Sequence, residues 1–228
     1  MSYFDKNKIY WEQGYPAENV DAPVFRGLWG RIIKPDFPDL IGGKLLDFGC
    51  GQGANTAFMS KKGFNVHGVD ISETDITAAR KNFPELASNF SICKPRPQDN
   101  NFYGFKDDIS VVMGIQSFYY FTDTDLSVLL KKLYDAMKPG ALFYATMMGE
   151  QSKEFFVNSI PAEDGLRIVN FKNDRLNVKD YCMSFIKDKE HLKKTFSMFK
   201  PLHMGFYTAK FREDEGDGMH YTFCGVKE

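Results

Sequence analysis

Several features that mark particular protein classes are missing from this chain of 228 residues. Its cysteines, Cys50, Cys93, Cys182 and Cys224, form no Cys-x-x-Cys pair, which argues against a disulfide framework and a cysteine-based metal site. No apolar run approaches the roughly 20 residues that cross a bilayer. The polar stretch 1–10 lacks the apolar region of a signal peptide. We therefore expect a cytoplasmic protein with no metal site and no membrane span.

An excess of charge of one sign is also missing. Lys and Arg together number 29, and Asp and Glu together number 30. Proteins that bind phosphate backbones usually carry a basic excess or a basic stripe, so nucleic acid is not an expected partner. Aromatic residues, in contrast, are abundant, with 22 Phe and 11 Tyr. Most should pack in a core, and some should line a pocket, because aromatic walls are typical of small-molecule sites.

Between residues 44 and 147, short apolar segments alternate with helical ones. Strands are expected at 44–48, 65–69, 90–93, 108–115 and 141–147. The clearest helix, 126–137, places its apolar residues at i, i+3, i+4 and i+7, and Ser72 is a candidate cap for another. This alternation predicts an α/β fold with a doubly wound, mostly parallel sheet.

The last strands complete this sheet. Segments 202–211 and 220–226 read as strands and flank a polar turn. We expect them to form an antiparallel hairpin at the sheet edge, which gives seven strands in all.

The remaining segments are expected to cover the sheet. Prolines break up residues 1–40, which predicts an N-terminal cap with short helical pieces at 6–13 and 24–33. Residues 178–199 are predicted to be mainly helical, within a segment, 149–200, that should select the substrate. The whole chain, 1–228, is interpreted as one domain.

A glycine-rich loop joins the first predicted strand to the helix after it. Gly49, Gly51 and Gly53 allow a tight turn and let a ligand approach the backbone closely. The loop also fits a dinucleotide pattern, and Asp70 would suit the ribose of either kind of ligand. Asp47 favours a ligand with a positive charge, because a carboxylate repels a pyrophosphate.

The ordered motifs resemble those of the class I S-adenosylmethionine (SAM)-dependent methyltransferases. Residues 45–53, LLDFGCGQG, look like the family's first motif, and 66–72, VHGVDIS, are similar to its second segment. Residues 108–112, DISVV, resemble the fourth strand, and 137–142, MKPGAL, resemble the approach to the fifth. The resemblance covers roughly 40–150 and implies methyl transfer from SAM, with S-adenosylhomocysteine (SAH) as product.

The resemblance also implies roles for individual residues at the cofactor. Asp47 and the backbone of Gly49, Cys50 and Gly51 would hold the amino-acid end of SAM. Asp70 would accept hydrogen bonds from the ribose hydroxyls.

Further cofactor contacts follow from the same resemblance. Ile71 would pack on the adenine, and Gln98 or Asp99 would reach its amino group, although the loop around them departs from the family pattern. Gly114 would lie near the methionine part, and Trp11 of the cap would close over the cofactor.

The acceptor of the methyl group is less constrained by the sequence. The tetrapeptide of amino-methylating nucleic-acid enzymes is absent after the fourth strand, and so is the Pro-Cys pair of cytosine methylation. Gln116, Tyr119 and Tyr120 are the candidate substrate contacts. If a histidine acts as base, His203 or His220 is favoured. We expect O- or N-methylation of a small-molecule or glycan acceptor; the alternatives are an NAD-type oxidoreductase and a SAM-binding protein without turnover.

Overall fold

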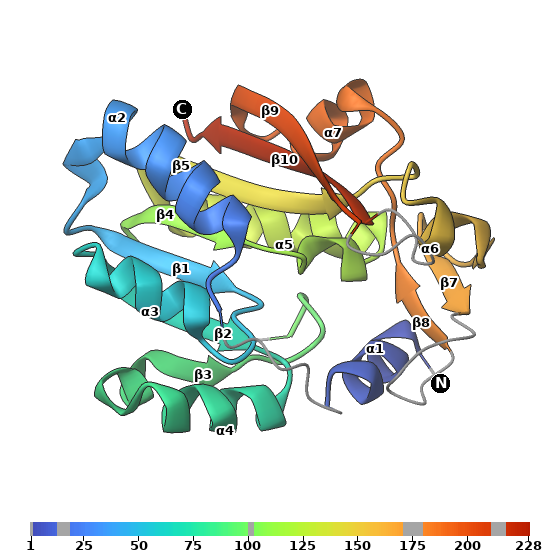
Figure 1. Ribbon diagram of the computed structural model, residues 1–228, viewed down its shortest axis with the longest axis horizontal. Coiled ribbons are helices and arrows are strands. Elements are labelled where there is room, and N and C mark those ends of the chain that lie inside the picture. Colours follow the sequence, from blue (N-terminus) through green and yellow to red (C-terminus); the bar gives the residue numbers. More distant parts are fainter. Residues whose placement is uncertain (1, 13–18, 100–102, 171–179, 211–217) are drawn as a thin grey trace.

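A seven-stranded sheet forms the centre of the molecule (Figure 1). The computed structural model describes residues 2–12, 19–99, 103–170, 180–210 and 218–228. The strands are β1 (Lys44–Phe48), β2 (Asn65–Asp70), β3 (Phe90–Ile92), β4 (Ile109–Gly114), β5 (Met137–Met148), β9 (Lys200–Ala209) and β10 (Gly218–Val226). They lie in the order β3-β2-β1-β4-β5-β10-β9. Strands β1 to β5 are parallel, and β10 pairs antiparallel with β5 and β9. The predicted sheet and its edge hairpin are confirmed.

Both faces of the sheet are buried, because successive strand residues point to opposite sides. Leu45 and Leu142 belong to one apolar cluster, which side chains of η1 (Pro23–Ile33) and α3 (Ala54–Lys61) complete. Leu46 and Phe143 belong to a second, which α5 (Asp123–Ala136) and α7 (Lys189–Thr195) cover. The sheet is therefore doubly wound, as predicted.

The other helical segments are short or lie at the margins of the sheet. They are α1 (Tyr3–Trp11), α2 (Lys34–Asp36), η2 (Pro38–Leu40), α4 (Glu73–Asn82), η3 (Pro84–Asn89), η4 (Phe118–Tyr120) and α6 (Lys153–Val157). The predicted cap of α4 is confirmed, since Ser72 Oγ accepts a hydrogen bond from the Asp75 N–H at 3.1 Å. In the N-terminal cap, η1 is a π-helix held to the sheet by the Tyr144 hydroxyl, which donates to the Pro23 carbonyl.

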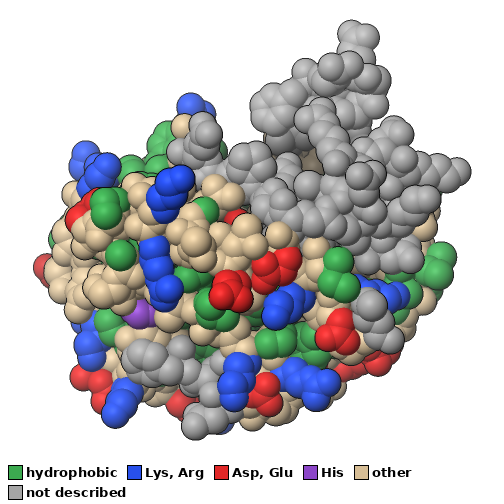
Figure 2. Space-filling model, turned by 90° about the horizontal axis from the view of Figure 1, so that it is seen from below, with side chains coloured by type: hydrophobic (Ala, Val, Ile, Leu, Met, Phe, Trp, Pro, Cys, Tyr) green, Lys and Arg blue, Asp and Glu red, His purple; other side chains and the backbone are tan. Residues whose placement is uncertain are grey.

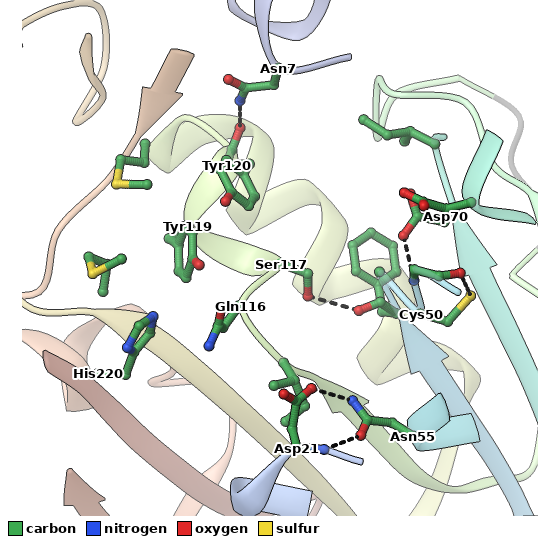
Figure 3. A pocket seen from close by; sticks show the side chains of 18 of the residues that line it. Asn7, Asp21, Cys50, Asn55, Asp70, Gln116, Ser117, Tyr119, Tyr120 and His220 are labelled. Atoms are coloured by element: carbon green, nitrogen blue, oxygen red, sulfur yellow. Dashed lines mark hydrogen bonds between the residues drawn. The ribbon is translucent and has the colours of Figure 1, made fainter. Parts of the chain in front are cut away.

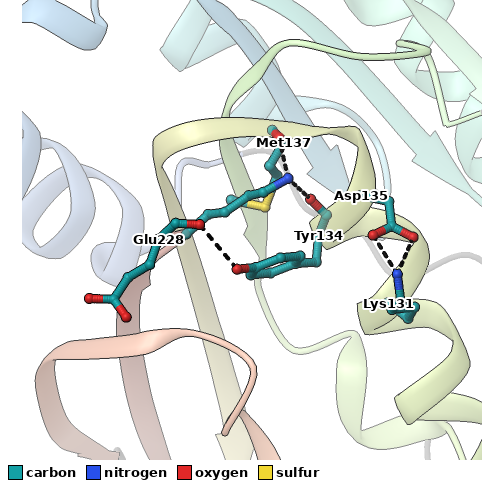
Figure 4. Close-up of polar contacts among 6 residues, drawn as sticks. Lys131, Tyr134, Asp135, Met137 and Glu228 are labelled. Atoms are coloured by element: carbon teal, nitrogen blue, oxygen red, sulfur yellow. Dashed lines mark hydrogen bonds and ion pairs between the residues drawn. The ribbon is translucent and has the colours of Figure 1, made fainter.

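Polar contacts with the C-terminal residues fix the end of α5 (Figure 4). Lys227 Nζ donates to the carbonyls of Tyr134 and Met137, at 2.7 Å each. The Tyr134 hydroxyl donates to the carbonyl of Glu228. A cation at a helix C-terminus is favourable because the last carbonyls have no partner within the helix.

A small antiparallel sheet lies beside the main one. Its strands pair in the order β6 (Ser159–Pro161), β7 (Arg167–Asn170) and β8 (Asp180–Met183). The prediction that 178–199 is mainly helical was therefore wrong: 180–183 form a strand, and only 189–195 form the helix α7. The apolar run at 181–183 is too short to define a period, and its pairing with β7 decides its conformation.

The described residues contain neither a membrane-spanning helix nor a cluster of metal ligands. No described helix is long and apolar enough to cross a membrane. The same part of the chain contains no group of three His, Cys, Asp or Glu side chains that could hold a metal ion.

Candidate active site

A cavity of about 540 Å³ opens at the carboxyl ends of β1, β2 and β4. Its volume falls in the range of about 300–1,000 Å³ that is typical of small-molecule sites. The carboxyl edge of an open α/β sheet is the usual place for a ligand. Most of the described lining residues come from the glycine loop, the end of β2, the segment after β4, the N-terminal cap, β8 and β10 (Figure 3).

The glycine loop forms one wall of the cavity. The N–H groups of Gly49 and Cys50 both donate to the Val69 carbonyl, at 2.8 and 3.0 Å, which holds the loop to the end of β2. Gly51 has φ 50°, and a Cβ built on it would meet no atom within 4 Å. The backbone of Gly51 therefore faces open space, where a ligand can approach it.

Asp70 lies at the end of β2, beside this loop. Its two carboxylate oxygens accept hydrogen bonds from the N–H groups of Gly51 and Ser72, each at 2.9 Å. Burial raises the pKa of Asp70 to about 6, although both N–H groups favour the ionised form. A carboxylate has about four acceptor positions, so Asp70 keeps capacity for two ligand hydroxyls. The neighbouring Ile71 also lines the cavity.

Asp47 lies beneath the loop and is absent from the described cavity wall. It is 1% exposed, and its Oδ2 accepts a hydrogen bond from Thr56 Oγ1 at 2.6 Å. Burial raises its pKa to about 7. Direct contact between Asp47 and SAM stays a prediction; the geometry provides a buried carboxyl below the glycine loop.

Three other predicted cofactor residues, Gln98, Asp99 and Gly114, are not part of the described cavity wall. Gln98 donates to Asp125 at the start of α5, and the Asp99 carbonyl accepts from Lys132. A Cβ on Gly114 would fall 2.2 Å from the ring of Phe118, so the absence of a side chain at Gly114 allows the Phe118 ring to pack against the backbone of β4. Trp11 ends α1, and its side chain lies outside the described residues. The adenine contact stays a prediction.

The three predicted substrate residues all line the cavity (Figure 3). Gln116 lies two residues beyond the end of β4 and has φ 55°, which a residue with a side chain rarely adopts. Its N–H donates to Thr146 Oγ1 at 2.8 Å, and its side-chain amide donates to the Tyr207 hydroxyl at 3.3 Å. Tyr119 and Tyr120 form the adjoining wall, with ring centroids 4.6 Å apart. Strained backbone of this kind is concentrated at functional sites.

Two cavity residues of the N-terminal segment, Asn7 and Asp21, are not marked by any sequence pattern. Asp21 and Asn55 form two hydrogen bonds with each other, at 2.8 and 2.9 Å, and this pairing places the Asp21 carboxylate at the cavity. Asn7 of α1 exchanges two hydrogen bonds with the backbone of Cys182 in β8. Asn7 and Asp21 lie in a cap without hydrophobic periodicity, so their place at the cavity is evident only in the folded chain.

Helix α1 forms one side of the cavity and bridges two parts of the molecule. Its Asn7 contacts β8, and Glu12 at its end accepts hydrogen bonds from Glu73 N–H and Thr74 Oγ1, at 3.0 and 2.8 Å. Helix α1 thus connects the start of α4, near the glycine loop, with strand β8 of the small sheet, near Tyr119. Two other aromatic residues of the cap do not contribute to the described wall. Trp29 packs against the apolar cluster of Leu45 and Leu142, and Tyr15 lies outside the described residues.

His220 of β10 is the second histidine that the sequence favoured as a base, and it lines the cavity. It is 6% exposed, and burial lowers its pKa to about 4. Its Nε2 is buried and has no hydrogen-bond partner among the described residues. His203, the other candidate, is exposed on β9 and is not part of the described wall.

Several known proteins that this chain resembles are methyltransferases by name. Residues 45–140 match the family model described as a methyltransferase domain. The chain is 29% identical over 153 residues to a ubiquinone biosynthesis O-methyltransferase of Chelativorans sp., which covers 67% of this chain and 56% of that protein. It is 27% identical over 138 residues to methyltransferase YqeM of Bacillus subtilis, which covers 59% of this chain and 54% of that protein. The chain thus spans about half the length of these curated relatives.

Solved structures share the fold. A SAM-dependent methyltransferase from Methanosarcina mazei superposes with a TM-score of 0.64 at 16% identity, covering 85% of this chain and 97% of that one. Magnesium protoporphyrin IX methyltransferase of Synechocystis with bound SAH gives 0.57 at 14% identity, covering 99% and 94%. Residues 45–140 are therefore similar to a methyltransferase domain, and the chain has the class I, Rossmann-like fold seen in solved SAM-dependent methyltransferases.

Proposed function

We propose that this chain transfers a methyl group from SAM to a small-molecule acceptor, on oxygen or nitrogen. One observation carries the proposal: a single cavity connects the glycine loop and Asp70 with the polar and aromatic wall around Gln116. Donor and acceptor bound side by side in one cavity meet the main requirement of methyl transfer, which is positioning.

The residues at the loop end fit SAM. The open space in front of Gly51 admits a ligand against the backbone, and Asp70 has the acceptor positions that a ribose needs. When bound, SAM supplies a methyl carbon activated by a positively charged sulfur. The carboxylates of Asp21, Asp70 and Asp75 line the cavity and favour a cation there. Within the described wall no Lys or Arg is present, so a dinucleotide pyrophosphate would lack a basic side chain.

The acceptor end favours a neutral, partly apolar small molecule. Its wall includes Met148, Phe155, Tyr181 and Met183, and the last two belong to β8. A phosphate or carboxylate on the acceptor would find no cationic partner among the described wall residues. On the surface in Figure 2, described basic and acidic side chains are interspersed, which suits a small molecule better than nucleic acid. A glycan remains a candidate, whereas the aromatic wall favours a smaller, flatter acceptor.

Calorimetric titration with SAH tests the donor half of the proposal. We expect micromolar binding to the wild type and at least about 100-fold weaker binding to Asp70→Ala, because two hydrogen bonds to a charged group contribute about 1.5–3 kcal/mol each. Asp39→Ala, an exposed carboxylate elsewhere, is the matched control and should bind normally. Absent binding to the folded wild type, or equal affinity in Asp70→Ala, would refute the assignment.

A further inference from the structure

An unpaired nitrogen of His220 stands out at the acceptor end of the cavity. Buried polar atoms in proteins nearly always have a partner, and an exception calls for an explanation. In the described part of the chain, His220 Nε2 is the one buried side-chain nitrogen or oxygen without a hydrogen bond. The ring lines the cavity, on the same side as Tyr119 and Gln116 (Figure 3).

The surroundings of the ring fix its orientation. The Tyr207 ring stacks on it, with centroids 5.1 Å apart and planes 6° from parallel, and the Tyr119 ring lies at 6.0 Å. Tyr207 is also the cross-strand neighbour of His220 in the β9–β10 pair. Two aromatic neighbours therefore restrict the movement of the ring.

The tautomer follows from the other ring nitrogen. Nδ1 lies 3.4 Å from the Gly218 carbonyl, which can only accept a hydrogen bond. A proton on Nδ1 satisfies that carbonyl and leaves a lone pair on Nε2. Nε2 is then an acceptor, and its missing partner is a donor.

Gln116 carries a second polar group on the same wall of the cavity. Its amide nitrogen donates to Tyr207, so its amide oxygen is turned to accept. Tyr207 thus contacts Gln116 through a hydrogen bond and His220 through ring stacking, and Gln116 and His220 both line the cavity.

We propose that Nε2 of His220 accepts the hydrogen bond, and then the proton, of a neutral hydroxyl-bearing acceptor, so that the enzyme is an O-methyltransferase. The inference rests on the proposed methyl transfer. The hydroxyl oxygen forms the bond to the methyl carbon, the carbon–sulfur bond breaks with its electron pair left on sulfur, and the hydroxyl proton passes to Nε2. As the new bond forms, the hydroxyl becomes strongly acidic, and a weak base is sufficient to take its proton. The proton leaves to solvent when the product departs.

The first test is a binding measurement that does not depend on turnover. In long-range ¹H–¹⁵N spectra of the protein with SAH, His220 should be the neutral tautomer with its proton on Nδ1. Phenol, used as the probe, should shift the Nε2 resonance, whereas anisole, which has the same ring and no hydroxyl proton, should not. A proton on Nε2, no shift with phenol, or equal shifts with both probes would overturn the proposal.

The second test compares variants with labelled SAM and phenol. His220→Phe should lower kcat for phenol about 100-fold or more, the usual contribution of a general base, and should keep the SAH affinity of the wild type. His203→Phe, on the neighbouring strand, is the matched control and should behave as the wild type. If the larger ring disturbs packing, His220→Leu replaces it, and a cooperative thermal transition confirms folding.

These tests separate the two proposals. A wild type that fails to bind SAH refutes the methyltransferase assignment itself. A wild type that binds SAH, together with a His220→Phe variant that methylates phenol at the wild-type rate, refutes only the role of His220.

Discussion

Replacing Asp47 with Asn should change the stability of the protein in a way that depends strongly on pH. Burial raises the pKa of Asp47 in the folded chain to about 7, against 3.8 for an ordinary Asp. One pKa unit corresponds to about 1.4 kcal/mol, so ionising the buried carboxyl costs on the order of 4 kcal/mol. That cost is absent below pH ~4, grows between pH ~4 and ~7, and is complete above pH ~7.

Asn removes the charge and can keep the hydrogen bond from Thr56, which donates to a carboxylate oxygen in the wild type. Relative to the wild type, the unfolding free energy of Asp47→Asn should therefore rise by a few kcal/mol between pH 4.5 and pH 8. Urea unfolding at both pH values measures the difference, with the exposed Asp39→Asn as a control expected to stay within about 0.5 kcal/mol. A difference that is the same at both pH values would refute the reasoning.

The same substitution separates stability from binding. An ionised carboxyl below the glycine loop favours a cationic ligand, and SAM carries a positive sulfur that SAH lacks. Asp47→Asn should consequently weaken SAM binding more than SAH binding. An equal loss of affinity for the two ligands would show that the charge of Asp47 does not stabilise the positive sulfur of SAM.

Two further substitutions test the acceptor wall and the end of α5. Gln116→Gly should relieve the positive φ and stabilise the fold by about 1 kcal/mol while slowing methylation of phenol; Gln116→Ala, which lacks the amide and keeps the strain, should slow methylation without the gain in thermal stability. A gain of equal size in both variants would contradict the strain argument. Lys227→Met should lower the unfolding free energy by about 1–3 kcal/mol, because Nζ donates two hydrogen bonds to carbonyls at the end of α5. Lys200→Met, which breaks an exposed ion pair with Glu228, should change it by less than about 1 kcal/mol, and equal losses would contradict the role given to Lys227.

Local patterns were sufficient to predict the central sheet. Strands β1 to β4 are short segments of three to six residues, and β5 contains the mostly apolar run 141–148. Leu45 and Leu46 belong to different apolar clusters, as expected of neighbouring residues in a strand with two buried faces. The cap of α4 at Ser72 was readable for the same reason, because a capping residue acts within one helical turn.

The small sheet and much of the site wall were beyond local patterns. Strand β8 has four residues, and its conformation depends on pairing with β7 and not on a local sequence pattern. Asp21 reaches the cavity through its pairing with Asn55, a residue 34 positions away. Gln116 and His220 come together only because β4, β5 and β10 lie side by side, which no spacing in the chain records.

The central claim is that this cavity takes SAM, and one competition measurement tests it most directly. The wild type is incubated with equal concentrations of SAM, SAH, NAD and NADH, free ligand is removed, and the compounds released on denaturation are identified by mass spectrometry. We expect SAM and SAH to be retained by the wild type and lost from Asp70→Ala. Retention of NAD or NADH, or of none of the four, would contradict the account.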